Sequence, residues 1–130
     1  MTIKVAQRLF LVAGIYGVAV VAPMFFLEDQ IGRYDPPPVT HPEFYYGFAC
    51  VTLAWQIVYL MMWRDPLRLR HVLIPAVLGK TGFAISALLL FALNRVPGAR
   101  VILPSVDLLL AALFVWAYVA LGRLAPSSAG

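Results

Sequence analysis

The residue best suited to chemistry in this chain is Lys80, which lies near the middle of a long apolar segment. The segment runs from His71 to Leu93 and reads HVLIPAVLGKTGFAISALLLFAL, with Lys80 as its one Asp, Glu, Lys or Arg. As a helix it would be about 34 Å long, against a bilayer hydrocarbon core of about 30 Å. An ammonium group at that depth costs at least about 2.5 kcal/mol. We therefore expect Lys80 to face protein or water and to have a polar partner.

The preceding apolar segment, residues 44–63, carries nearly all of its polar-capable side chains on one stripe. They recur in alternating steps of four and three residues, the spacing of a single helix face. Such a stripe should point inward, either as a hydrogen-bonding seam between helices or as part of a substrate pathway. Its members are Tyr45, Ala49, Thr52, Gln56, Tyr59 and Trp63.

The depth of each residue along its helix predicts that Lys80 lies next to this polar stripe. Counted from the same membrane face, Lys80 and Gln56 both lie about 20 Å deep. Asp107 is the alternative, but it lies about 15 Å shallower than Lys80 if its helix begins at Ser105. A direct ion pair would then need helix tilt or water, and Asp107 could instead favour the helix dipole. The candidate ligand-binding residues are accordingly Lys80, Gln56, Thr52, Tyr59, Tyr16 and Asp107.

Composition indicates that the elements positioning these residues are membrane helices. Of the 130 residues, 62% are hydrophobic and 12% are charged, against about 45–50% and about 25% in soluble domains. Four segments are long enough to span a bilayer, which predicts an all-α integral membrane bundle of four antiparallel transmembrane helices. We expect helices over residues 5–27, 44–63, 71–93 and 105–124, in a single transmembrane domain covering residues 1–130.

The basic residues at the segment ends predict the orientation. One side carries six Lys and Arg and the other carries three, so the positive-inside rule places both termini in the cytoplasm. This favours a multi-pass membrane protein. Arg64, Arg68 and Arg70 lie in the hairpin after residue 63, where the head groups of membrane lipid are their default partners. The basic residues form no patch with interleaved aromatics, which argues against nucleic acid as a partner.

The stretch HPEFYYGFACVTLAWQIVYLMMWRDPLRLRHVLIPAVLGKTGFA resembles small uncharacterised four-helix bacterial membrane proteins, related loosely to the DoxX-like group. The resemblance covers residues 41–120, chiefly the PEFYYGF start, the LAWQ segment, the RDP hairpin and the LGKTGF segment. The resemblance implies a four-helix fold in the bacterial inner (cytoplasmic) membrane and no settled activity. Some DoxX members are associated with membrane-bound redox complexes, an analogy at the level of the fold.

The first functional hypothesis is a small accessory or structural subunit without catalytic activity. It would pack against a larger membrane assembly of other subunits, or against copies of itself. The chain shows no recognisable catalytic, cofactor or nucleotide motif, and one cysteine and two histidines offer no multi-cysteine metal site or paired haem ligation. We assign no catalytic or metal-binding residue and no particular cofactor. The contact surface would include the apolar face opposite the polar stripe, with Phe48, Trp55 and Met62.

The second hypothesis is a membrane-embedded pocket for a small hydrophobic ligand. A quinone, an isoprenoid or a sterol-like molecule would suit such a pocket, with isomerase or redox-accessory chemistry as an option. Lys80, with Gln56 and the neighbouring hydroxyl groups, would polarise or protonate the ligand. A transporter or channel ranks last, because four helices with one buried cation offer a thin pathway.

Overall fold

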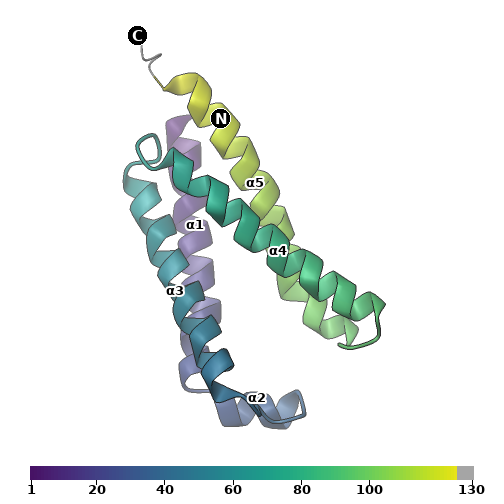
Figure 1. Ribbon diagram of the computed structural model, residues 1–130. Helices are drawn as coiled ribbons and strands as arrows, with labels where there is room; N and C mark the ends of the chain where they lie inside the picture. Colours follow the sequence, from purple (N-terminus) through teal and green to yellow (C-terminus); the bar gives the residue numbers. More distant parts are fainter. Residues whose placement is uncertain (126–130) are drawn as a thin grey trace. The chain divides into compact units, whose positions relative to one another are not determined.

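The computed structural model describes residues 1–125, and within them the chain contains helices and no strand (Figure 1). Four helical stretches are long and apolar enough to cross a membrane, which confirms the predicted all-α class and indicates a multi-pass membrane protein. The stretches are Ile3–Phe25, Pro42–Arg64, Arg70–Ala92 and Gly98–Leu124. The described helices fall into two compact units, residues 7–64 and residues 1–6 with 65–125. Residues 126–130 of the predicted single domain lie outside the described part.

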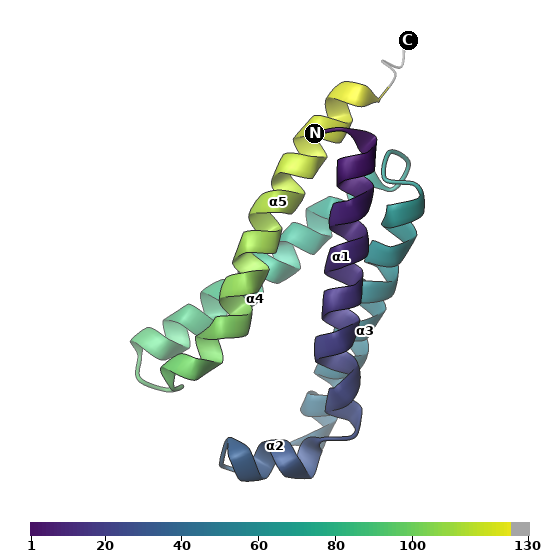
Figure 2. The ribbon, with the colours of Figure 1, turned by 180° about the vertical axis from the view of Figure 1, so that it is seen from behind.

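The unit of residues 7–64 is built on α1 (Ile3–Val21) and α3 (Pro42–Arg64), which run side by side (Figures 1 and 2). Gly14 and Gly17 of α1 permit this close approach. A Cβ added at Gly14 would lie 2.8 Å from Leu60 Cδ2 and 3.2 Å from the backbone oxygen of Gln56. Small residues serve membrane helices in this way, because they let two backbones come within van der Waals distance.

A short helix, α2 (Glu28–Tyr34), follows the 3-10 turn η1 (Ala22–Phe25) and was not predicted from the sequence. Glu28 and Asp29 lie in its first turn and Arg33 in its last, the charge order that favours a helix dipole. Tyr46 fastens α2 to α3 by donating a 2.7 Å hydrogen bond to Glu28 Oε2. Tyr45 donates a second bond of 2.7 Å to the backbone oxygen of Met24. The loop is therefore partly helical before its proline-rich end.

The inward face of α3 largely follows the predicted polar stripe but turns near its end. Ala49, Gln56 and Tyr59 are buried as expected. Met62, predicted to lie on the opposite, apolar face, is fully buried, whereas Trp63, predicted to lie on the stripe, is 37% exposed. The buried face therefore passes through residue 62 and not 63, a change of one residue and about 100° around the helix axis.

The other unit contains the hairpin of α4 (Leu73–Ala92) and α5 (Ile102–Leu124), which lie side by side in both views (Figures 1 and 2). The 3-10 turns η2 (Arg70–Val72) and η3 (Gly98–Val101) precede the two helices. The helix predicted over residues 105–124 thus begins three residues earlier, at Ile102. Pro104 is tolerated there because the first N–H groups of a helix have no intrahelical acceptor.

The small residues of α4 play different parts. Ala76 and Ala84 are buried in the hairpin. Gly79 and Gly82 are exposed, and a Cβ added at either would meet nothing within 4 Å. A role for these two glycines in close packing is therefore not seen among the described residues.

Candidate functional site

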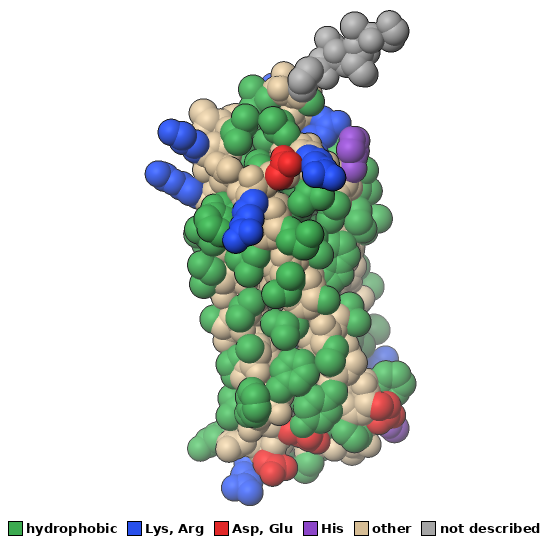
Figure 3. Space-filling view, turned by 90° about the vertical axis from the view of Figure 1, so that its left-hand side faces the viewer, with side chains coloured by type: hydrophobic (Ala, Val, Ile, Leu, Met, Phe, Trp, Pro, Cys, Tyr) green, Lys and Arg blue, Asp and Glu red, His purple; other side chains and the backbone are tan. Residues whose placement is uncertain are grey.

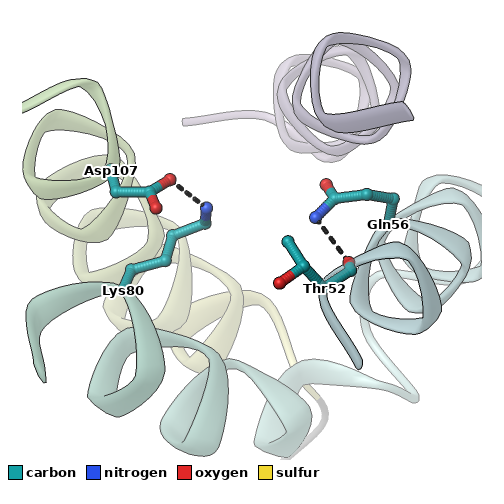
Figure 4. A network of polar contacts seen from close by, with 4 residues as sticks. All are labelled: Thr52, Gln56, Lys80 and Asp107. Atoms are coloured by element: carbon teal, nitrogen blue, oxygen red, sulfur yellow. Dashed lines mark hydrogen bonds and ion pairs between the residues drawn. The ribbon is translucent and has the colours of Figure 1, made fainter. Parts of the chain in front are cut away.

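The candidate site on the hairpin is an ion pair between Lys80 of α4 and Asp107 of α5. Lys80 Nζ donates to Asp107 Oδ1 at 2.5 Å, and the two side chains point toward each other in Figure 4. The Lys80 side chain is 11% exposed and that of Asp107 is 24% exposed. Lys80 is the eleventh residue of a 23-residue span, so the ammonium group lies near the middle of its apolar helix. At such a depth the carboxylate offsets a charge that would otherwise be costly.

The register of the hairpin brings this pair together. Lys80 precedes Asn94, in the turn, by 14 residues, and Asp107 follows Asn94 by 13. The same register places Arg70 against Tyr118 at the other end of the two helices. Because both helices rise about 1.5 Å per residue, residues equally far from the turn meet at the same depth.

The expectation that Asp107 lies too shallow for a direct ion pair with Lys80 is therefore wrong. It took Ser105 as the start of the helix, which left Asp107 within its first turn. The earlier start at Ile102, with η3 before it, moves Asp107 more than a turn deeper. The carboxylate then lies within reach of Lys80 directly, without an intervening water.

On α3, Gln56 contacts residues of its own unit. Its Nε2 donates a 2.9 Å hydrogen bond to the backbone oxygen of Thr52, one turn earlier (Figure 4). Its side chain lies against Gly17 of α1, where an added Cβ would overlap the Gln56 amide. Gln56 is 4% exposed, so this amide is buried between α1 and α3.

The remaining predicted ligand-binding residues lie in the same unit as Gln56. Tyr59 is 2% exposed, and its ring centroid is 6.2 Å from that of Trp55. Tyr16 and Thr52 are half-buried on α1 and α3. The six candidates thus divide between the two units. Lys80 and Asp107 form one group, and Gln56, Thr52, Tyr59 and Tyr16 belong to the other unit.

The three arginines predicted to meet lipid head groups differ in their contacts. Arg64 is exposed, with its guanidinium carbon 6.0 Å from the ring centroid of Trp63. Arg68 is exposed, and its backbone N–H donates to Asp65 Oδ1. Arg70 instead packs its guanidinium on Tyr118 of α5, at 5.0 Å from the ring centroid. Sequence reasoning did not identify Tyr118 as a contact of Arg70.

The polar groups of this site already have hydrogen-bond or ion-pair partners within the protein. Within residues 1–125, no buried side-chain nitrogen or oxygen lacks a hydrogen-bond partner. No group of three or more His, Cys, Asp or Glu side chains in that part of the chain could hold a metal ion. Fold and site together define a helical protein with four potential membrane spans and an ion pair on one pair of them. No protein-family model, curated protein or solved structure matches the chain.

Proposed function

We propose that this protein is an accessory or structural subunit of a larger membrane assembly and is not itself an enzyme. The observation that carries the proposal is the apolar exposed face of α3. Phe44, Phe48 and Val51 are 73%, 45% and 62% exposed. Along α3, hydrophobic side chains cover the surface, and charged side chains gather toward its ends (Figure 3). Large aromatic side chains on an exposed helix face suit contact with another apolar helix as well as with lipid.

The internal pairing of the polar groups supports the same proposal. The Lys80 ammonium is matched by a carboxylate, and the Gln56 amide donates to a backbone oxygen. The ion pair joins α4 to α5, and the Gln56 side chain packs against Gly17 of α1, so both side chains have a structural role. We further propose a four-helix antiparallel bundle in the bacterial inner membrane, loosely DoxX-like, with both termini in the cytoplasm.

Site-specific photocrosslinking tests the subunit proposal in intact membranes. A photoreactive amino acid at Phe48 should crosslink to one distinct protein, because Phe48 lies on the proposed contact face. The matched control is Ile15 on α1, which is 56% exposed and apolar but lies outside that face. Crosslinks that join only lipid at both positions would contradict the proposal. So would a protein that purifies from mild detergent as a single species with no partner and no second copy.

Reporter fusions test the proposed orientation. Green fluorescent protein fused after Gly130 should fluoresce, and alkaline phosphatase at the same position should be inactive, because both properties indicate a cytoplasmic C-terminus. Alkaline phosphatase inserted near Pro97, in the turn between α4 and η3, should be active. The reverse pattern would invert the proposed topology.

A second candidate function, a site for a small hydrophobic ligand, is favoured by one observation. The Lys80–Asp107 pair lies deep within two apolar helices, and Asp107 remains 24% exposed. A quinone, an isoprenoid or a sterol-like molecule could accept a hydrogen bond there. Lys80→Met should then abolish the co-purification of such a ligand. Unchanged ligand content in a folded Lys80→Met protein would remove this candidate.

A further inference from the structure

At the basic end of the hairpin, the Arg70 side chain packs against α5. Its guanidinium carbon lies 5.0 Å from the centroid of the Tyr118 ring. Its Nη1 occupies the space that a Cβ at Gly122 would take. Its Nη2 lies 3.4 Å from His71 Nε2, and the His71 ring meets Tyr118 edge-on, with 6.0 Å between centroids. These three neighbours hold the guanidinium in one orientation.

Among the described residues, no ion pair neutralises the positive charge at this end of the hairpin. Within residues 1–125, neither Arg70 nor Arg68 has a carboxylate within ion-pair distance. The same holds for Arg123, which follows Gly122. Asp65 is the one acidic residue in the segment 65–69 between α3 and η2, and its Oδ1 accepts a hydrogen bond from the backbone N–H of Arg68 at 3.2 Å. A net positive charge therefore remains where two apolar spans end.

We propose that Arg70, positioned by Tyr118, Gly122 and His71, binds the phosphate of an anionic phospholipid. A guanidinium has five N–H donors in a planar fork, which matches two oxygens of a phosphate, and the His71 contact occupies one of the five. Stacking on Tyr118 fixes the plane of the fork before the lipid arrives. Phospholipid phosphates are the anions present at the depth where a membrane span ends. This site does not depend on the protein having a partner subunit.

The variant Gly122→Ala separates a built site from general charge attraction. The added Cβ takes the space of Arg70 Nη1, so the guanidinium must move although no charge is lost. Arg70→Gln removes the charge itself. The matched control is Arg95→Gln, which removes one exposed arginine from the turn at the other end of the hairpin. Full-length protein in neutral detergent would be titrated with phosphatidylglycerol, phosphatidylcholine and inorganic phosphate, and bound lipid counted by native mass spectrometry.

We expect Arg70→Gln to weaken phosphatidylglycerol binding by about fivefold, the contribution of one basic residue at an anionic surface. Gly122→Ala should also weaken it, although the charge remains, because the guanidinium is displaced. Arg95→Gln should leave binding unchanged. Equal losses in Arg70→Gln and Arg95→Gln, with none in Gly122→Ala, would show attraction by net charge alone and overturn the proposal. Inorganic phosphate that displaces phosphatidylglycerol at equal concentration would overturn the lipid assignment in favour of a free anion.

A folding defect is distinguished by a further variant and by thermal unfolding without lipid. If Gly122→Ala lowers the Tm in lipid-free detergent, Arg70→Lys takes its place. It keeps the charge but lacks the planar fork, so it should lose the same binding. Full phosphatidylglycerol binding by a folded Arg70→Lys protein would overturn the proposed recognition.

Discussion

Replacing Lys80 by methionine should destabilise the α4·α5 hairpin by about 3–5 kcal/mol, the typical cost of removing one partner from a buried ion pair. The carboxylate of Asp107 would remain between two apolar helices without the ammonium group that now lies 2.5 Å away. Asp107→Leu should cost a similar amount, because it leaves the Lys80 ammonium near the middle of its span. The free energy of unfolding can be measured in mixed micelles with increasing dodecyl sulfate.

The double variant Lys80→Met/Asp107→Leu tests whether the loss of stability comes from leaving one buried charge unpaired. Since it leaves no buried charge, we expect it to recover most of the lost stability, as apolar replacements of whole buried ion pairs often do. Arg95→Met is the charge-matched control and should change stability by less than about 0.5 kcal/mol, because Arg95 is exposed. A double variant as unstable as the sum of the two single variants would show that the pair does not act as a unit.

Gly17→Ala should destabilise the packing of α1 on α3 by about 1–3 kcal/mol, the usual cost of overfilling a packed site. The new Cβ would overlap the amide of Gln56, which is 4% exposed and cannot swing into open space without leaving its buried position. Moving that amide would also break its hydrogen bond to the Thr52 backbone oxygen. The same unfolding measurement reports the loss.

Removal of the Gln56 side chain should make Gly17→Ala harmless. The three atoms nearest the new Cβ all belong to that side chain, so Gln56→Ala vacates the space. Gly47→Ala on α3 is the matched control, since a Cβ there meets nothing within 4 Å. If Gly17→Ala costs the same in both the native and the Gln56→Ala background, the contact with Gln56 is not the cause.

The four long apolar helices could be predicted from the sequence because the signal is local and additive. A run of about 20 apolar residues must satisfy its backbone groups within itself when it lies in lipid, and a helix does this without help from other segments. The need of Lys80 for a partner followed in the same way, from the cost of one charge in an apolar run. For helix α2 the sequence holds only a weaker local signal, which is the order of its charges, with Glu28 and Asp29 ahead of Arg33.

The identity of the partner of Lys80 depended on the tertiary structure. The start of α5 three residues earlier and the four-residue turn η3 before it together shift Asp107 by about 12 Å along the axis, enough to change a distant carboxylate into an ion-pair partner. No local pattern sets that start, because Pro104 is compatible with several positions in the first turn.

The roles of the glycines were likewise decided by packing. Gly17 and Gly122 lie against side chains that an added Cβ would strike, whereas Gly79 and Gly82 face open space. All four are the same residue within apolar helices, so composition cannot tell them apart. By itself the sequence determined four apolar helices and a lysine that needs a partner, since both follow from the transfer of single segments into lipid. The tertiary structure alone decided which residues meet, because each step of one residue turns a helix face by about 100° and moves it about 1.5 Å.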